Sequence, residues 1–142
     1  MPDLNGRRRV VIEGVFPEID CGRFPIKRVA GESVTVEADI FADGHDLLAC
    51  VLLHRPAGAA AWTETRMAPL INDRWRASFT VTGLRRYEYT LQAWVDPFAT
   101  WLRDVGKKLD AGLDVEVEKL VGALLLEETA GRAPAGDAER LR

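Results

Sequence analysis

The period of the hydrophobic pattern changes at Pro97, and this change constrains the fold more than any other feature of the 142-residue sequence. Before Pro97, apolar residues alternate with polar ones, as they do in half-buried β-strands. After it, they recur at every third or fourth position, which is typical of amphipathic helices. The sequence therefore predicts a β-rich domain over 1–97, a helical segment over 98–131 and a flexible polar tail over 132–142.

The β-rich region predicts several short strands with no helix between them. Residues 34–40, 75–81 and 87–95 alternate most clearly, and turn residues separate them. The continuous apolar run over 47–53 fits a strand buried on both faces, although its periodicity alone does not exclude a short helix. The expected fold class is mainly β: an immunoglobulin-like antiparallel β-sandwich followed by a C-terminal helical extension.

Two apolar stripes follow Pro97. Gly112 separates them as a helix stop, and Asp114 stands where the N-cap of the second helix belongs. The two helices could pack on each other and on the sandwich. They could instead form part of a larger bundle whose other helices lie beyond residue 142 or in another chain, and we favour this second reading. The stripes consist of Phe98, Trp101, Leu102, Val105 and Leu109, then Val117, Leu120, Val121, Leu124 and Leu125.

Charge and hydropathy exclude two classes of partner. The formal net charge is −3, and the only basic cluster, at 7–9, is short, so we expect no nucleic acid partner. No apolar run reaches the length of about 18 residues that a membrane span requires, and the first residues are polar, so we expect a cytoplasmic protein. Cys21 and Cys50 lie in no CxxC pair and are expected to be reduced thiols.

The sequence contains no recognisable catalytic, cofactor-binding or metal-binding motif. His45 lies between Asp43 and Asp46, and these side chains could supply metal ligands from one loop. Histidine beside aspartate in a turn more commonly stabilises the loop by hydrogen bonds, and we prefer that interpretation. No pair of carboxylates can be nominated for glycoside chemistry, so we expect no catalytic residue, cofactor or metal in this chain.

Trp94 is the aromatic residue that departs from the pattern of its strand. Its register places it opposite the apolar residues of 87–95, on the face that carries polar side chains. Something other than the main core should therefore cover it. A domain contact is the preferred interpretation, and a platform that stacks on sugar rings is the alternative.

Several stretches, taken in order, resemble one enzyme family. These stretches are Arg9–Glu13, Phe16-Pro17, Asp20–Arg28, Gly31-Glu32, Ala38-Asp39, Asp43–Asp46, Ala93–Trp101, Lys108–Gly112 and Val121–Glu127. Together they resemble the N-terminal region of the bacterial α-1,4-glucan:maltose-1-phosphate maltosyltransferases, over about residues 9–128. Order and spacing carry the resemblance, since no single motif is decisive.

The resemblance implies an enzyme that extends α-1,4-glucans with maltosyl units from α-maltose 1-phosphate by a retaining mechanism. It also implies an α-amylase-type barrel preceded by an immunoglobulin-like domain, a helical insert, and homodimers with the N-terminal and helical domains at their interface. A barrel of this type takes about 250 residues. The catalytic carboxylates therefore belong to a part that these 142 residues do not contain.

The chain is accordingly expected to be a non-catalytic scaffold and dimerisation module. Its expected partners are the catalytic domain of the same polypeptide and a second copy. The alternatives are a stand-alone glucan-binding module, whose partner is an α-glucan, and a free-standing protein-interaction domain. The candidate interdomain or dimer contacts are Arg23, Phe24, Lys27, Arg28, Trp94, Phe98, Trp101, Leu120 and Leu124.

Overall fold

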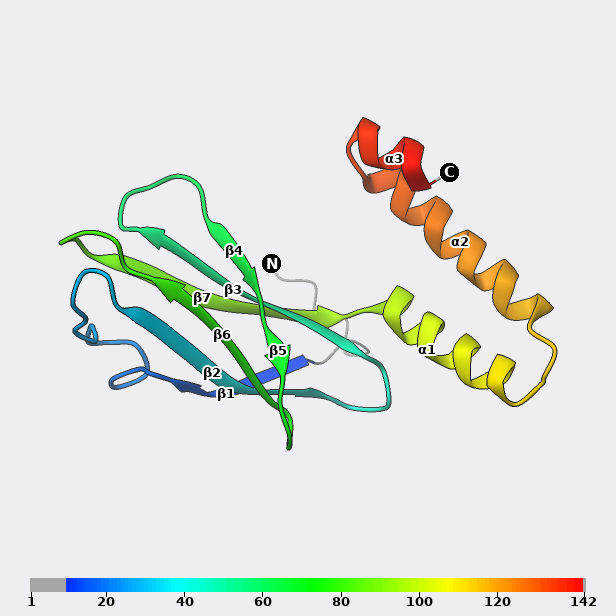
Figure 1. Ribbon diagram of the computed structural model, residues 1–142, viewed down its shortest axis with the longest axis horizontal. Helices are drawn as coiled ribbons and strands as arrows, with labels where there is room; N and C mark the ends of the chain where they lie inside the picture. The colour runs from blue at the N-terminus through cyan, green and yellow to red at the C-terminus, as the bar shows by residue number, and fades with distance from the viewer. Residues whose placement is uncertain (1–9, 142) are drawn as a thin grey trace. The chain divides into compact units, whose positions relative to one another are not determined.

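The computed structural model describes residues 10–141, which fall into two compact units. The first unit ends at Val95 and contains the strands, and the second begins at Asp96 and is helical (Figure 1). The boundary therefore lies close to Pro97, where the hydrophobic period changes. The class predicted from the sequence, mainly β with a C-terminal helical extension, is confirmed.

The first unit is a sandwich of two antiparallel sheets. One sheet has the strand order β1–β2–β6–β5, and the other has the order β4–β3–β7. Strands β1 and β7 are thus edge strands of the two sheets. The strands are β1 (Val10–Phe16), β2 (Ser33–Ala42), β3 (Leu48–Pro56), β4 (Thr63–Arg66), β5 (Ala68–Pro69), β6 (Arg74–Thr80) and β7 (Tyr87–Val95).

The core lies between the sheets and follows the predicted alternation. In β2 and β6, Val34 pairs with Phe79 and Val36 with Ala77, and all four side chains are buried. Half-buried residues of β7 close the core from the second sheet. The most fully buried side chains are Ile40, Leu52, Val34, Val36 and Cys50.

Strand β3 is buried on both faces in its first half. Four consecutive residues, 49–52, are each no more than 3% exposed. A half-buried strand would expose every second one of them, so both faces are covered here. The strand predicted for the continuous apolar run is confirmed.

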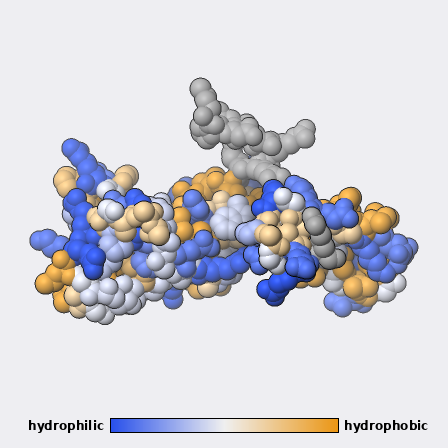
Figure 2. All heavy atoms as spheres, turned by 90° about the horizontal axis from the view of Figure 1, so that it is seen from above, coloured by the Kyte–Doolittle hydropathy of each residue, from blue (hydrophilic) through white to orange (hydrophobic). Residues whose placement is uncertain are grey.

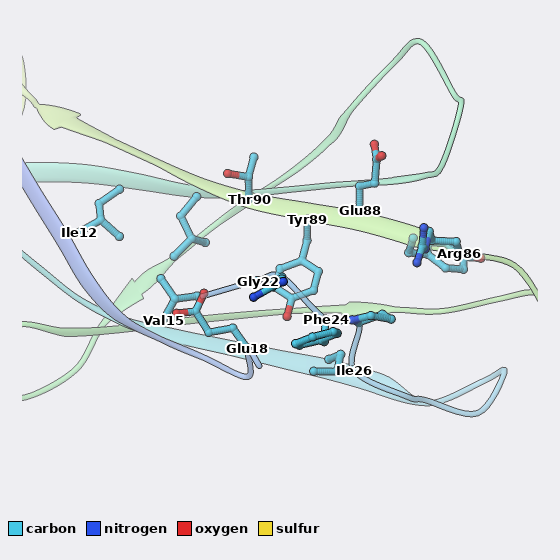
Figure 3. Close-up of a pocket in the computed structure, with 14 residues that line it drawn as sticks. Ile12, Val15, Glu18, Gly22, Phe24, Ile26, Arg86, Glu88, Tyr89 and Thr90 are labelled. Carbon is cyan, nitrogen blue, oxygen red and sulfur yellow. The ribbon is translucent and has the colours of Figure 1, made fainter. Parts of the chain in front are cut away.

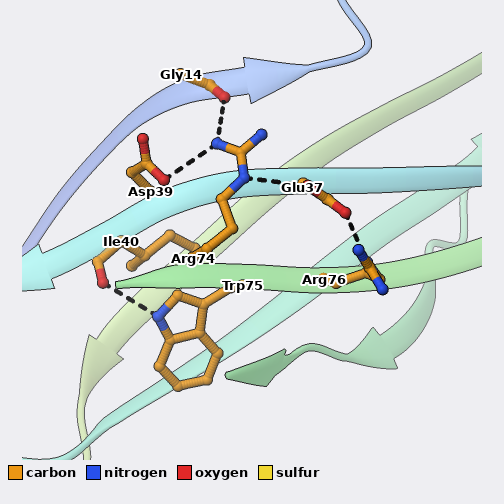
Figure 4. A network of polar contacts seen from close by, with 7 residues as sticks. All are labelled: Gly14, Glu37, Asp39, Ile40, Arg74, Trp75 and Arg76. Atoms are coloured by element: carbon orange, nitrogen blue, oxygen red, sulfur yellow. Dashed lines mark hydrogen bonds and ion pairs between the residues drawn. The ribbon is translucent and has the colours of Figure 1, made fainter. Parts of the chain in front are cut away.

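Charged side chains link three strands on the outer face of the other sheet. The Arg74 guanidinium donates to a Glu37 oxygen and to Asp39 Oδ1, both at 3.1 Å, and to the carbonyl oxygen of Gly14 (Figure 4). The Arg76 guanidinium donates to the other Glu37 oxygen at 2.6 Å. The network joins β1, β2 and β6 and covers the outside of the sheet with paired charges.

The second unit contains α1 (Pro97–Asp110), α2 (Glu116–Arg132) and α3 (Ala135–Leu141). Asp96 caps α1, because its Oδ1 accepts the Ala99 N–H at 2.9 Å. Gly112 follows with a φ of +68°, a conformation that glycine adopts without strain, and so ends the helix as predicted. Among residues 10–141, none of the helices combines the length and apolar character needed to cross a membrane.

Two details differ from the sequence-based expectation. Helix α2 begins one residue later than predicted, with Val115 as N-cap, although Asp114 Oδ1 still accepts the Glu116 N–H at 3.1 Å. The predicted flexible tail instead contains α3. Its first turn forms because the Pro134 carbonyl accepts the N–H groups of 137 and 138, and a proline at the start of a helix loses no hydrogen bond.

Candidate functional site

The second helix presents an apolar stripe to solvent. Val117, Leu120 and Leu124 are 69%, 67% and 65% exposed. Their spacing of three and four residues places them on one face of α2, together with the 45% exposed Val121. Figure 2 shows apolar side chains open at the molecular surface between hydrophilic ones. The helical unit therefore leaves the stripe uncovered, as expected of a face built for another protein surface.

The opposite side of α2 packs against α1 through a glycine. Gly122 is buried, and the Trp101 ring lies directly against it. The Trp101 indole N–H donates to the Glu118 carbonyl at 2.6 Å, and its ring is tilted against Phe98 at a centroid distance of 5.4 Å. The structure thus places Trp101 in the contact between the two helices, while Phe98 is 41% exposed.

A groove runs between the edge strands of the sandwich. It has a volume of about 530 Å³ and lies between β1, the loop that follows it, and β7 (Figure 3). The Tyr89 hydroxyl donates to the carbonyl of Pro17 and ties the loop to β7. The predicted contact residues Arg23 and Phe24 line this groove, and the Arg23 guanidinium lies 5.5 Å from the centre of the Phe24 ring.

A second pocket, of about 400 Å³, adjoins the first and is basic. Lys27 and Arg28 line it from the loop before β2, and Arg85 and Arg86 line it from the turn between β6 and β7. Among residues 10–141, those that line the pocket include no aspartate or glutamate. We call these four side chains the basic rim.

The sequence indicated two of the four residues of the basic rim and did not indicate the other two. Lys27 and Arg28 were predicted contacts, whereas Arg85 and Arg86 were not. The adjacent pair of arginines after Gly83 was the available signal. It could not be assigned, because only the pairing of the strands brings the two loops together.

Trp94 lies on the outer face of β7, as its register predicted. It is 43% exposed and pairs across the strands with Ala49, which is 3% exposed. Trp62 is 38% exposed, and the Arg55 guanidinium lies 4.1 Å from the centre of its ring. Of the two rings, Trp62 therefore already has a cationic partner, which Glu88 holds in place through a 2.9 Å ion pair.

No metal centre is found among residues 10–141, where no three His, Cys, Asp or Glu side chains gather to hold an ion. His54 is half-buried in β3. Its ring stacks on Phe79 with a centroid distance of 4.4 Å, and burial lowers its pKa. His54 thus packs its half-buried ring against a core residue and is not part of a metal cluster.

Comparison with known proteins shows which family the chain resembles. A family profile for "Alpha-1,4-glucan:maltose-1-phosphate maltosyltransferase, domain N/S" matches residues 8–142. Proteins named alpha-1,4-glucan:maltose-1-phosphate maltosyltransferase are similar to the chain: that of Chlorobaculum tepidum is 54% identical over 97% of the chain and 21% of the relative. That of Myxococcus xanthus is 49% identical over 87% of the chain and 19% of the relative.

The chain thus spans about a fifth of the length of the curated relatives that it matches. The match extends beyond the stretches that carried the resemblance and includes both the sandwich and the helices. The chain therefore belongs to the domain N/S family of the α-1,4-glucan:maltose-1-phosphate maltosyltransferases.

Proposed function

We propose that this chain is the non-catalytic N-terminal scaffold and dimerisation module of a maltosyltransferase that extends α-1,4-glucans from α-maltose 1-phosphate. Family membership supports the parent activity, and the share of each relative that the chain spans leaves most of the enzyme outside it. In this proposal the rest of the polypeptide carries the catalytic barrel, and the sandwich and helices hold two copies together.

The exposed stripe on α2 is the observation that carries the proposal. Leu120 and Leu124 leave about two thirds of their surface in water, although each leucine stabilises a complex by about 1.5–3 kcal/mol when fully buried. Helix formation does not require these leucines, since alanine has a higher helix propensity. Burial against another protein surface accounts for their presence.

Sedimentation equilibrium of the complete polypeptide tests the dimerisation role. We expect a dimer whose dissociation constant rises by about tenfold or more in Leu120→Glu/Leu124→Glu, because two charges then enter the apolar interface. Ala123→Glu is the matched control, since Ala123 is exposed on the same helix but outside the stripe. A monomeric wild type, or equal weakening by the control, would contradict the proposal.

An activity measurement tests the non-catalytic role. Residues 1–142 alone, mixed with α-maltose 1-phosphate and a glucan acceptor, should release no phosphate. The complete polypeptide should release it under the same conditions. Phosphate release by the 142-residue chain would assign chemistry to this module and overturn the proposal.

Glucan binding is a second candidate function, favoured by the exposed Trp94. A ring that is 43% exposed on the outer face of a sheet can stack on a sugar ring. Calorimetric titration of the chain with maltoheptaose should then show binding that Trp94→Ala abolishes and that Trp62→Ala leaves nearly intact. Absence of heat in the wild type would exclude this function.

We also propose that the protein works in the cytoplasm. Its thiols support a reducing compartment, because Cys21 and Cys50 are both free. Fractionation of the native cells, followed by immunoblotting, tests this location. Recovery of the protein from the membrane or the medium would contradict it.

A further inference from the structure

We propose that the basic rim is a docking surface for a carboxylate-bearing segment of the same polypeptide beyond residue 142. This inference rests on the proposed function, because it requires that the rest of the enzyme is present. It adds the chemistry of the contact and two residues, Arg85 and Arg86, that the sequence did not indicate.

The rim gathers like charges that the described residues do not neutralise. Lys27 and Arg28 lie almost sixty residues from Arg85 and Arg86 in the sequence, yet all four line one pocket. None of the four forms an ion pair with another described residue, whereas other basic residues of the sandwich, Arg74 among them, bind carboxylates. All four residues are exposed, so their positive charges face solvent at this end of the sandwich and attract an anionic group.

The backbone that carries the rim is held in place. The Tyr87 hydroxyl accepts the N–H groups of Thr82 and Gly83 at 3.1 and 3.2 Å, which fixes the turn before Arg85. The Arg86 carbonyl accepts the Ala57 N–H at 2.9 Å. Arginines on a fixed turn lose less entropy on binding than arginines on a free loop.

The opposite side of the pocket is held in the same way. Arg28 donates to the Lys27 carbonyl at 2.7 Å, and the Glu32 carboxylate accepts the Val29 N–H at 2.9 Å. These local bonds restrain the Arg28 side chain and the end of the loop that carries it.

The pocket beneath the rim favours a protein partner. Its floor is apolar and includes Val34, Phe79 and Val81, so it can cover the apolar stem of a docking side chain while the exposed cations meet its carboxylate. Carboxylates pair with arginine in the bidentate geometry that this environment strengthens. A neutral glucan would gain nothing from the charge of the rim, and a nucleic acid would need a longer basic surface than a single pocket end.

Zero-length cross-linking of the complete polypeptide tests the contact. A carbodiimide joins a lysine amine to a carboxylate in contact with it, with loss of water. We expect an amide between Lys27 and an aspartate or glutamate beyond residue 142, identified by mass spectrometry of the digest. The Arg85→Lys variant should add a second amide to the same segment, because it places a reactive amine on the other lip.

Two internal controls accompany the experiment. Lys119 and Glu116 lie 2.6 Å apart in α2, so their amide should form in every sample and report the reactivity of the reagent. In 1 M salt the Lys27 amide should decrease several-fold, because exposed charges are screened over a few ångströms. A Lys27 amide that does not respond to salt counts against an electrostatic contact.

Other outcomes overturn the inference. Amides from Lys27 that reach only carboxylates within residues 1–142 would show that no further segment docks. Amides between light and isotope-labelled copies would assign the rim to a second copy instead. Protection of Lys27 by millimolar inorganic phosphate in the isolated 142-residue chain, without any amide in the complete polypeptide, would assign it to a small anion.

The activity and the oligomeric state of the complete polypeptide test the proposed function independently of the docking surface. The complete polypeptide either transfers maltosyl units and forms a dimer or it does not, whatever Lys27 contacts. A dimeric, active enzyme without the Lys27 amide would reject only the docking surface. An inactive polypeptide with the amide would reject the maltosyltransferase role and leave the docking surface standing.

Discussion

A β-carbon on Gly122 would lie 2.3 Å from the Trp101 ring, closer than real β-carbons come to neighbouring atoms. The absence of a side chain at Gly122 therefore sets how closely α1 and α2 approach. The same approach lets the Trp101 indole reach the Glu118 carbonyl. This contact between a large and a small residue joins α1 to α2, together with the ion pair between Lys108 and Glu118.

Substitution of Gly122 by alanine should destabilise the helical unit. Overpacking costs about 1–3 kcal/mol, which exceeds the gain of about 1 kcal/mol from replacing glycine with alanine in a helix. Urea unfolding followed by the helical circular dichroism signal measures the loss. Gly131→Ala is the matched control in the same helix, because nothing lies within 4 Å of its added methyl group, and it should be neutral or stabilising.

The two thiols should react at very different rates. Cys21 is exposed, whereas Cys50 is 1% exposed and burial raises the pKa of its thiol to about 11. The thiolate is the reactive form, so at neutral pH Ellman's reagent should label Cys21 at once and Cys50 only after the sandwich unfolds. Cys21→Ser should remove the fast phase alone. A fast phase that persists in Cys21→Ser would show that β3 opens readily.

Protonation of His54 should oppose folding. Its ring lies against Phe79, its Nδ1 is buried without a hydrogen-bond partner, and burial lowers its pKa below 6.5. Between the lowered pKa and 6.5 the unfolded chain binds more protons than the folded one, so stability should fall as pH falls through 6.5. His54→Phe keeps an aromatic ring and should remove this part of the pH dependence, as measured by urea unfolding. Above about pH 7.5 the two curves should run parallel, because the histidine is neutral in both states.

The charged network on the outer face of β2 should also lose stability in acid, but at a lower pH than His54. Hydrogen bonds from Arg76 and then Arg74 lower the pKa of Glu37 below 4.5. A carboxyl with a lowered folded-state pKa stabilises the fold above its unfolded pKa, and this contribution is lost as pH falls through the folded value. The stability difference between wild type and Glu37→Gln should therefore be present at pH 7, begin to decline near pH 4.5 and be lost once the pH falls below the lowered folded-state pKa.

A control of equal charge completes that comparison. Glu64→Gln removes one carboxylate from an exposed position of β4. It should change stability less than Glu37→Gln at pH 7, since no described arginine or lysine pairs with Glu64. Equal effects from the two variants would mean that net charge, and not the cross-strand network, controls stability.

The sequence by itself determined the order of the elements and the composition of the core. Alternation over 34–40 and 75–81 and the four-residue spacing after Pro97 are local, and each follows from burying one face of a strand or helix. The glycine stop at Gly112 is local as well, because one residue's φ decides it. The exposed register of Trp94 followed from the same period-two pattern.

The tertiary structure alone decided which distant residues meet. The basic rim joins Lys27 and Arg28 to Arg85 and Arg86, and the strand pairing that brings them together leaves no trace in either segment. The need for glycine at position 122 appeared only once the Trp101 ring was placed against it. The stripe on α2 was visible in the sequence, but its solvent exposure was not, since periodicity shows that a face is apolar and says nothing about what covers it.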